Sequence, residues 1–458
     1  MFLLLTIGVI TLLFLYLKLK YFTLRGPIPG LAPHFLFGNL IQSGQLLNGI
    51  SLPQVCSKFK CRYGDIFQFW FGPIRFIMVN GITDVQHIFT HRNIYEQGDI
   101  YIEQFGIIVP NSLISVKGTR FKRHATITLP LFRRGNITNN FDLIVDCTDK
   151  LLANWRASPN KHVHCDVVRQ SQNLMLQIFG LIGFDYDLEM LDEHDSNQNE
   201  LGRALFDLLK AAEFIIFAPT FMGKLYTTFS GRHRKAQAIS DILNYLQLLT
   251  CLSQNEVYQE MLLFLIAGFE ATSTALAWLI HFLSKYPRVQ QKIKAELMDI
   301  CNSQNLSVNQ LDSLTYLDCV INETLRFFPP ANGTVRTLTI DDRLPGSGVQ
   351  LYKGDSVLIP FHNLSHDTRL WSIDPNLFYP ERFLGEDKNY NPYALIPFGS
   401  GHRQCIGQDL ARFELKVIVA RMMQQVTFGD GGPDVNSGGH VTRLVVAPKH
   451  VGVTIEFV

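Results

Sequence analysis

The sequence predicts a mainly α-helical fold with a small β-sheet region. Two alternating apolar segments, Asp65–Phe71 and Arg75–Val79, flank a Gly-Pro turn and indicate a hairpin. Helical periodicity then dominates from about residue 82 to residue 328, and short strands and turns return over residues 333–380. The chain has 458 residues, of which 47% are hydrophobic and 18% charged, and this composition is typical of a large globular core.

The N-terminal segment is predicted to be a single membrane span. Phe2 to Leu17 are mostly apolar, and Lys18, Lys20 and Arg25 follow. Lysines that reach the lipid interface extend such a stretch to the thickness of a bilayer, and the basic residues after it place the rest of the chain on the cytoplasmic side. The alternative is a cleaved signal peptide, but the segment has no basic n-region and no small-residue cleavage site.

The remaining chain is predicted to form one catalytic domain. Residues 1–22 form the anchor and residues 23–35 a Pro/Gly-rich hinge, while no linker-like run divides residues 36–458. A net charge of +1 gives no reason to expect nucleic-acid binding. The eight cysteines have no CxxC pairs, which argues for a reducing compartment and against a disulfide framework or a zinc site.

Amphipathic periodicity predicts the helices. They cover Thr83–Thr90, Leu143–Ala157, Val167–Gly180 and Ala236–Leu249, followed by a long core helix from Glu256 to about Lys285 and a surface helix over Arg288–Cys301. Val357–Pro360 is the clearest strand in the later part of the chain.

The most specific motif surrounds Cys405 and reads Phe-Gly-Ser-Gly-His-Arg-Gln-Cys-Ile-Gly over residues 398–407. Gly399 and Gly401 let the backbone turn tightly under a flat cofactor. Gly407 lets the next helix, from Gln408 to about Gln424, begin close to the sulfur with its positive end toward a thiolate. Arg403 is a fixed cation suited to a carboxylate of the cofactor.

Three further motifs occur in the order expected if this loop binds a haem. They are Ala267-Gly268-Phe269-Glu270-Ala271-Thr272, Glu323-Thr324-Leu325-Arg326 and Tyr379-Pro380-Glu381-Arg382-Phe383. With the cysteine loop they make the chain resemble the cytochrome P450 family over nearly its whole length. The resemblance implies a cytochrome P450-like fold preceded by one N-terminal transmembrane helix.

The resemblance also implies the cofactor and the partners. The cofactor is expected to be haem b, with the Cys405 thiolate as axial ligand of the iron. The expected partners are an apolar small-molecule substrate, membrane lipid and an electron donor like NADPH-cytochrome P450 reductase, because no GxGxxG fingerprint follows a strand. The expected location is the endoplasmic reticulum membrane, with a cytoplasmic catalytic body.

Individual residues receive roles from the same resemblance. Phe398, Gly399, Gly401 and Gly407 shape the haem loop, and Arg403 and Arg336 are expected to pair with the haem carboxylates. The family usually has a third arginine, four residues after a tryptophan. Here Phe121 and Ala125 occupy these two positions, so His124 or Arg123 is a candidate substitute, although Lys122 and Arg123 also suit a solvent-facing helix surface.

Glu323, Arg326 and Arg382 are expected to form a buried structural cluster behind the haem. Glu323 and Arg326 are three residues apart on one helix, close enough to pair, and Arg382 can add a bidentate partner. A solvated helix pair is the alternative.

The segment around Glu270 is expected to deliver the protons that O–O cleavage consumes. Small residues at Ala267 and Gly268 let this helix approach the haem face. The family usually has a threonine directly after the acidic residue, but here Ala271 occupies that position and Thr272 lies about 100° further around the helix. Either Thr272 acts through water or a local helix bulge, or oxygen activation leaks peroxide. The alternative for Thr272 is a packing role in which its hydroxyl only bonds back to a carbonyl.

Other segments leave the activity open. Expected substrate contacts include Phe105–Val109, Phe214–Phe221, Phe269, Ala271 and Ala331–Val335. The segment between Arg234 and Glu256 is shorter than is usual in the family.

The leading interpretation is a monooxygenase. The alternatives are a reductase-independent isomerase, dehydratase or peroxygenase, favoured by Ala271, and a degenerate haem-binding homologue, favoured by Ala125 and the short segment.

Overall fold

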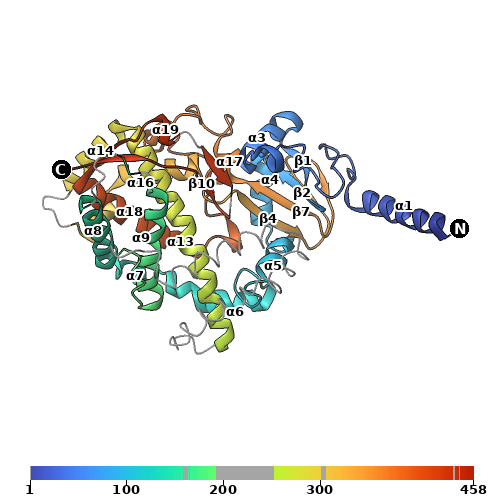
Figure 1. The fold of residues 1–458 in the computed structure, drawn as a ribbon, viewed down its shortest axis with the longest axis horizontal. Helices are drawn as coiled ribbons and strands as arrows, with labels where there is room; N and C mark the ends of the chain where they lie inside the picture. Colours follow the sequence, from blue (N-terminus) through green and yellow to red (C-terminus); the bar gives the residue numbers. More distant parts are fainter. Residues whose placement is uncertain are drawn as a thin grey trace. The chain divides into compact units, whose positions relative to one another are not determined.

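The computed structural model describes residues 2–157, 163–164, 166–191, 252–300, 306–436, 439–442 and 444–458. Over this part of the chain the protein is mostly helical with small sheets, as the sequence predicts (Figure 1). The predicted helix over Ala236–Leu249 and the predicted substrate segment Phe214–Phe221 lie outside the described residues.

The chain divides into two compact units, each assembled from three separate segments. Unit 1 consists of Met1–Ile100, Asn332–Leu370 and Asn391–Arg403, and unit 2 of Tyr101–Ala331, Trp371–Tyr390 and Gln404–Val458. The single catalytic domain expected over residues 36–458 stays a prediction.

A five-stranded sheet organises unit 1. Its order is β1 (Ile66–Phe71), β2 (Ile74–Val79), β7 (Ser356–Pro360), β4 (Gly333–Leu338) and β3 (Tyr95–Gln97). The predicted hairpin is confirmed as β1 and β2, which pair antiparallel across a turn where Gly72 has a φ of 57°. β2 pairs in parallel with β7, so residues about 280 apart in the sequence become neighbours.

The other elements of unit 1 are helices, one strand pair and two 3-10 turns. They are α1 (Phe2–Tyr21), α2 (Gln45–Asn48), α3 (Leu52–Tyr63), α4 (Ile82–Thr90), α17 (Phe361–Ser365), the strand pair β5 (Asp342–Arg343) and β6 (Gln350–Leu351), and the 3-10 turns η3 (Pro392–Ala394) and η4 (Gly401–Arg403). α5 (Asp99–Phe105) begins in unit 1 and ends in unit 2.

Unit 2 is built mainly from helices. These are α6 (Gly118–Thr128), η1 (Leu129–Phe132), α7 (Arg134–Thr138), α8 (Phe141–Ala157), α9 (Val167–Phe184), α13 (Gln254–Lys285), α14 (Pro287–Ile300), α15 (Val308–Ser313), α16 (Thr315–Phe327), η2 (Pro380–Phe383), α18 (Gln408–Gln425) and α19 (Pro433–Asn436). Two antiparallel strand pairs complete it, β8 (Val426–Asp430) with β11 (Val453–Phe457) and β9 (His440–Thr442) with β10 (Val446–Pro448).

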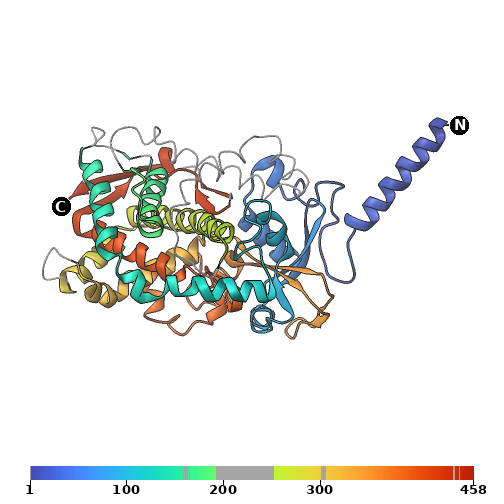
Figure 2. The same ribbon diagram turned by 90° about the horizontal axis from the view of Figure 1, so that it is seen from below.

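α13 is the central helix of unit 2, and the sequence predicts it to within two residues. Ser253 and Glu256 form a capping box that satisfies the first backbone N–H groups of the helix. α13 lies beside α9 in both views (Figure 1, Figure 2). A Cβ atom added to Gly268 would lie 2.7 Å from Cε2 of Phe179, so the glycine allows the two helices to pack closely.

The predicted anchor segment forms α1, a 20-residue helix about 30 Å long. Many of its described apolar side chains are exposed, including those of Leu5, Leu12 and Leu19. Among the described residues, α13 is the one helix that is long and apolar enough to cross a membrane, and 72% of its most apolar window is buried, as expected of a core helix. The N-terminal span stays a prediction.

Candidate active site

The Cys405 loop joins the end of unit 1 to the start of α18. The Cys405 side chain is exposed, and its sulfur accepts a hydrogen bond from the backbone N–H of Gly407, the N-cap residue of α18. Desolvation by the surrounding protein raises the pKa of the thiol, and the Gly407 N–H partly opposes this effect. The predicted placement of the sulfur next to the start of a helix is what the structure shows.

Both glycines before the cysteine adopt the left-handed conformation that the tight turn requires. Gly399 and Gly401 each have a φ of 72°, a region that residues with a Cβ rarely occupy. A Cβ atom on Gly401 would lie 2.7 Å from the backbone oxygen of Phe89, at the end of α4. Gly401 therefore lets the loop pack directly against the backbone of α4. Phe398, which precedes this turn, is half-buried.

Arg403 pairs with a carboxylate that the sequence analysis did not single out. Its Nε and Nη2 atoms donate to Oε1 of Glu96 on β3, at 3.2 and 3.0 Å. The Arg403 side chain is only 4% exposed. Burial raises the pKa of Glu96, but hydrogen bonds from His402 and from the Gln97 N–H, together with the charge of Arg403, outweigh burial and lower that pKa to about 2.

Arg336 lies in the same unit as Arg403, on strand β4. The register pairs Arg336 with Gln97, the residue next to Glu96, so Arg336 lies on the strand beside β3, whereas Arg403 reaches β3 from the turn η4. The buried guanidinium of Arg336 donates to Oγ1 of Thr334 and to the carbonyl of Val335. It also lies 5.5 Å from the ring centroid of Phe89. Phe89 therefore contacts Arg336 through its ring and the Gly401 loop through its backbone.

One stripe of α13 is less covered than the rest of this buried helix. Ala267 is exposed, and Phe264, Gly268 and Ala271 are half-buried, whereas most residues between and after them are buried. These four positions are three or four residues apart and therefore share one helix face. The stripe is lined mostly by small residues, and neighbouring aromatic rings cover part of it: Phe179 of α9 lies against Gly268, and Phe132 of η1 packs on Phe264.

Thr272 lies outside this stripe. It is 4% exposed, and its Oγ1 donates to the carbonyl of Gly268 at 2.8 Å. This is the bond back to a carbonyl that the sequence left as one alternative. Glu270 is half-buried, and its backbone carbonyl accepts a hydrogen bond from Oγ of Ser273 at 3.0 Å.

His124 points into unit 2, where two carboxylates engage it. Its Nδ1 lies 2.5 Å from Oε1 of Glu260, and its Nε2 lies 3.4 Å from Oε1 of Glu256, which also pairs with Arg123. The His124 side chain is fully buried. Both ring nitrogens of His124 thus face carboxylates of α13, and its role toward a haem carboxylate stays a prediction. Lys122 and Arg123 are exposed, as the alternative expects.

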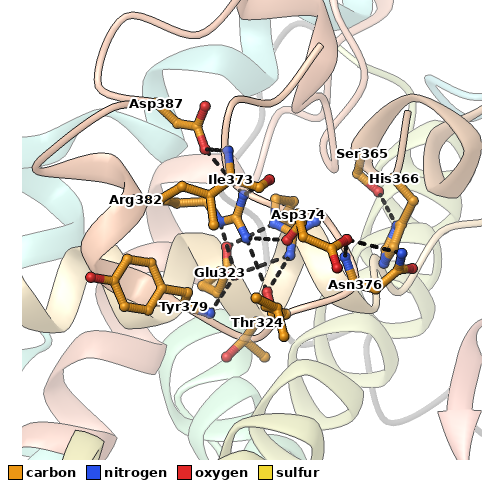
Figure 3. Close-up of polar contacts among 12 residues, drawn as sticks. Glu323, Thr324, Ser365, His366, Ile373, Asp374, Asn376, Tyr379, Arg382 and Asp387 are labelled. Carbon is orange, nitrogen blue, oxygen red and sulfur yellow. Dashed lines mark hydrogen bonds and ion pairs between the residues drawn. The ribbon is translucent and has the colours of Figure 1, made fainter. Parts of the chain in front are cut away.

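Glu323, Arg326 and Arg382 form one fully buried cluster in unit 2. Figure 3 shows Glu323 and Arg382 facing each other. Arg326 donates from Nε to Oε2 of Glu323 at 2.7 Å and from Nη2 to Oε1 at 2.9 Å, a bidentate pair. Arg382 donates from Nε to Oε1 of Glu323 at 3.1 Å, and the backbone N–H of Tyr379 donates to the same oxygen at 2.8 Å. Both oxygens of Glu323 are therefore satisfied.

The rest of the Arg382 guanidinium is also satisfied. Nη1 donates to Oδ2 of Asp387 and to the carbonyl of Ile373 (Figure 3). Nη2 donates to the carbonyls of Asp374 and Leu377. The ring centroid of Trp371 lies 5.4 Å from Cζ of Arg326 and 5.5 Å from Cζ of Arg382. The loop over residues 371–387 is thus fixed to α16 by charge, hydrogen bonds and cation–π contacts.

Each unit, taken by itself, holds groups of a kind that suits a haem with a thiolate ligand. In unit 2 the Cys405 side chain is exposed at a helix N-terminus. In unit 1 Arg336 and Arg403 are buried guanidinium groups, of the kind that pairs with carboxylates. Among the described residues no group of three or more His, Cys, Asp or Glu side chains can hold a bare metal ion.

Sequence reasoning missed Glu96, Glu256 and Glu260 as partners of the site residues. Glu96 is a single acidic residue in a three-residue strand, and no spacing rule relates it to Arg403. Glu256 and Glu260 are four residues apart on α13, so the sequence predicts that they share one helix face. It does not predict their contact with His124 on α6.

Comparison with known proteins identifies the family. The cytochrome P450 family model matches residues 28–248 and 242–451. Cytochrome P450 734A1 of Arabidopsis thaliana is 26% identical to this chain, over 89% of the chain and 86% of the relative. Cytochrome P450 3A17 of Cavia porcellus is 27% identical, over 88% and 85%. Cytochrome P450 3A11 of Mus musculus is 37% identical over a shorter region, 39% of this chain and 35% of the relative.

The two parts of the family match meet at residues 242–248, inside the segment that the sequence analysis found to be short. Together they cover most of the chain, including the Cys405 loop, the Glu323 cluster and α13. Cytochromes P450 bind haem through a cysteine thiolate and act with redox partners on small-molecule substrates. The chain belongs to the cytochrome P450 family and is an oxidoreductase of the P450 monooxygenase type.

Proposed function

We propose that this protein is a membrane-anchored monooxygenase that inserts one oxygen atom of O₂ into an apolar organic substrate, with electrons from a separate NADPH-dependent reductase. The observation that supports it best is the Cys405 loop, in which an exposed sulfur accepts a hydrogen bond from Gly407 at the start of α18. The family match over most of the chain supports the same reaction class.

Six residues of the loop, together with Arg336 of β4, have roles in this proposal. Cys405 is the thiolate ligand, and Arg403 and Arg336 bind the haem carboxylates. Phe398, Gly399, Gly401 and Gly407 give the loop its shape, since the two left-handed glycines turn the backbone and Gly407 begins the helix. When bound, haem with a thiolate ligand supplies the electron density that favours O–O cleavage.

Proton delivery is assigned to Glu270 and Thr272. The hydroxyl of Thr272 donates to the Gly268 carbonyl, so its oxygen can still accept a hydrogen bond from a water. Ala271 has no hydroxyl, and its position belongs to the less covered stripe of α13. Thr272 therefore acts through a water in this proposal, with Glu270 as the proton source.

The cysteine assignment is tested with the ferrous–carbon monoxide spectrum of the purified protein. Cys405→Ser is expected to abolish the thiolate-type Soret band, because a hydroxyl cannot donate as the sulfur does. Cys319→Ser is the matched control, since Cys319 is a buried cysteine on α16. A Cys405→Ser protein that keeps the thiolate band would overturn the assignment.

The relay is tested by measuring NADPH consumption, hydrogen peroxide release and product together. If Thr272 works through water, Thr272→Val uncouples the enzyme and raises peroxide release, while Ala271→Thr has little effect. If a hydroxyl at position 271 is what is missing, Ala271→Thr raises product formed per NADPH. Unchanged coupling in both variants would mean that the proposed relay, hydroxyl included, is wrong.

A second candidate is a haem-thiolate isomerase, dehydratase or peroxygenase that needs no reductase. The observation that favours it is the engagement of the Thr272 hydroxyl by Gly268 next to a position without a hydroxyl, Ala271. Turnover with and without NADPH and a P450 reductase separates the two reactions, because only the monooxygenase depends on both.

The membrane anchor is also a proposal. α1 is 20 residues long, most of its exposed side chains are apolar, and Lys18 and Lys20 stand in its last turn. We expect the full-length protein in the endoplasmic reticulum membrane, resistant to carbonate extraction. Removing residues 2–22 is expected to make the protein extractable while leaving haem binding intact. Ready extraction of the full-length protein would contradict the span.

A further inference from the structure

Glu96 holds the two basic residues that precede the cysteine in the loop. Its Oε1 accepts from Nε and Nη2 of Arg403, lies 3.3 Å from Nε2 of His402 and accepts from the backbone N–H of Gln97 at 2.8 Å. All of these residues belong to unit 1. The strand β3 thus brings one carboxylate to a pair of side chains that lie only two and three residues before Cys405.

The contact fixes the orientation of Arg403. A guanidinium is planar and carries its N–H donors in fixed directions. Because Nε and Nη2 both point at Glu96, the edge that carries Nη1 is directed away from this carboxylate. The side chain of Arg403 is nearly inaccessible to water, so its plane is set by the protein and not by solvent.

The contact also changes the charge next to the loop. Arg403 contributes one positive charge and Glu96 one negative charge, so the pair is neutral. In a partly desolvated setting a charge 3 Å away acts strongly on the field that a guanidinium projects. A haem carboxylate bound by Arg403 would therefore experience a weaker positive field than it would from an arginine without an acidic partner.

We propose that Glu96 is a positioning residue for the haem, which orients Arg403 and His402 and lowers the reduction potential of the iron by partly neutralising Arg403. This inference rests on the proposed function, because it requires that Arg403 binds a haem carboxylate and Cys405 the iron. The potential of a haem depends on ligand, burial and nearby charge, and Glu96 acts through the last of these.

The test compares midpoint potentials of the ferric/ferrous couple in full-length holoproteins. Glu96→Gln removes the charge and keeps an oxygen acceptor for Arg403, so we expect it to load haem and to shift the potential to more positive values. Glu96→Asp keeps the charge and is expected to stay closer to wild type than Glu96→Gln. Glu386→Gln is the control, since it makes the same change at an exposed glutamate and should leave the potential unchanged.

The ferrous–carbon monoxide spectrum of each protein distinguishes a failure of the proposed function from a failure of this inference alone. Absence of a thiolate band in the wild type would overturn the proposed function and this inference with it. Thiolate bands in all proteins, with equal potentials in wild type and Glu96→Gln, would overturn the inference alone. A Glu96→Gln protein that does not load haem would also contradict it, because the amide oxygen still accepts from Arg403 and should keep that side chain in place.

Discussion

Two buried carboxylates of unit 2, Glu323 and Glu260, differ in how completely they are paired. The two carboxylate oxygens of Glu323 accept four hydrogen bonds, from the guanidinium groups of Arg326 and Arg382 and from the backbone N–H of Tyr379. Glu260 has one oxygen 2.5 Å from Nδ1 of His124, while its Oε2 is buried without a hydrogen-bond partner among the described residues. Both side chains are 0% exposed, so burial alone does not distinguish them.

The difference teaches what a buried charge contributes to stability. A carboxylate that loses its water gains stability only if other groups replace that water at both oxygens. Around Glu323 two arginines, Asp387 and several carbonyls form a closed network, so removing one member leaves other charges uncompensated. Around Glu260 desolvation raises the carboxyl pKa, against the smaller effects of His124 and of the Leu113 backbone N–H. Glu323 therefore stabilises the groups around it, whereas Glu260 depends on the surrounding fold to stay buried.

Glu323→Ala should have the largest effect. It leaves Arg326 and Arg382 buried without their carboxylate, which costs about 3–5 kcal/mol of unfolding free energy. We expect a large drop in holoprotein yield and in melting temperature. Glu381→Ala is the control, because Glu381 lies in the same 3-10 turn as Arg382 but pairs with the half-exposed Lys292. Normal haem loading with a selective loss of turnover would contradict the structural role.

Trp371→Leu should have an intermediate effect on the same cluster. The variant removes the aromatic face near Arg326 and Arg382 and leaves both salt bridges. We expect a loss of about 2 kcal/mol, from the two cation–π contacts and the reduced packing. Trp371→Phe keeps an aromatic face and should lose less. Equal stabilities for the two variants, measured by denaturant unfolding, would show that ring and guanidinium groups do not interact.

The same amide substitution at the two carboxylates sharpens the comparison. Glu323→Gln weakens three charge-assisted contacts and should cost about 2–3 kcal/mol. Glu260→Gln keeps an acceptor for His124 and removes a poorly solvated charge, so its stability at neutral pH should lie within about 1 kcal/mol of wild type or above it. A larger loss of stability for Glu260→Gln than for Glu323→Gln would contradict the conclusion that Glu323 is the more completely paired carboxylate.

The smallest expected effect is a pH dependence of Glu260. Burial raises the pKa of Glu260 in the folded protein, so protons bind more tightly to the folded than to the unfolded state. The carboxyl therefore costs nothing below its ordinary value near 4.5 and destabilises the fold progressively as the pH rises above it. Its neighbours in this titration are His124 and Glu256, with Arg123 beyond them.

The measurement is the difference in melting temperature between Glu260→Gln and wild type. We expect the difference to move in favour of the variant between pH 5 and pH 8. A difference that stays constant, or that moves in favour of the wild type, would contradict the raised pKa of Glu260.

Local patterns made the Cys405 loop and the Glu323 pair predictable. The glycines at 399, 401 and 407 specify a tight turn and a helix start by their type, and the structure has left-handed glycines and α18 from Gln408. Glu323 and Arg326 are three residues apart, which sets their contact within one helix.

Contacts between distant segments were not predictable in the same way. His124 was expected to face a haem carboxylate because its motif position suggested it, but its direction depends on α13, more than 130 residues later. Glu96 meets Arg403 across 307 residues. Neither partner follows from helix or strand periodicity, because such patterns specify the face of an element and not which element covers it.

The parallel pairing of β2 with β7 has a consequence during synthesis of the chain. β2 ends at Val79, and its second neighbour β7 ends at Pro360, about 280 residues later. At translation rates of about 5–20 residues per second, the β2 edge stays unpaired on the ribosome for roughly 15–60 s. An unpaired apolar strand edge is a template for pairing with other chains. The nascent protein is therefore expected to need chaperone protection until the strand from the far end of the sequence arrives.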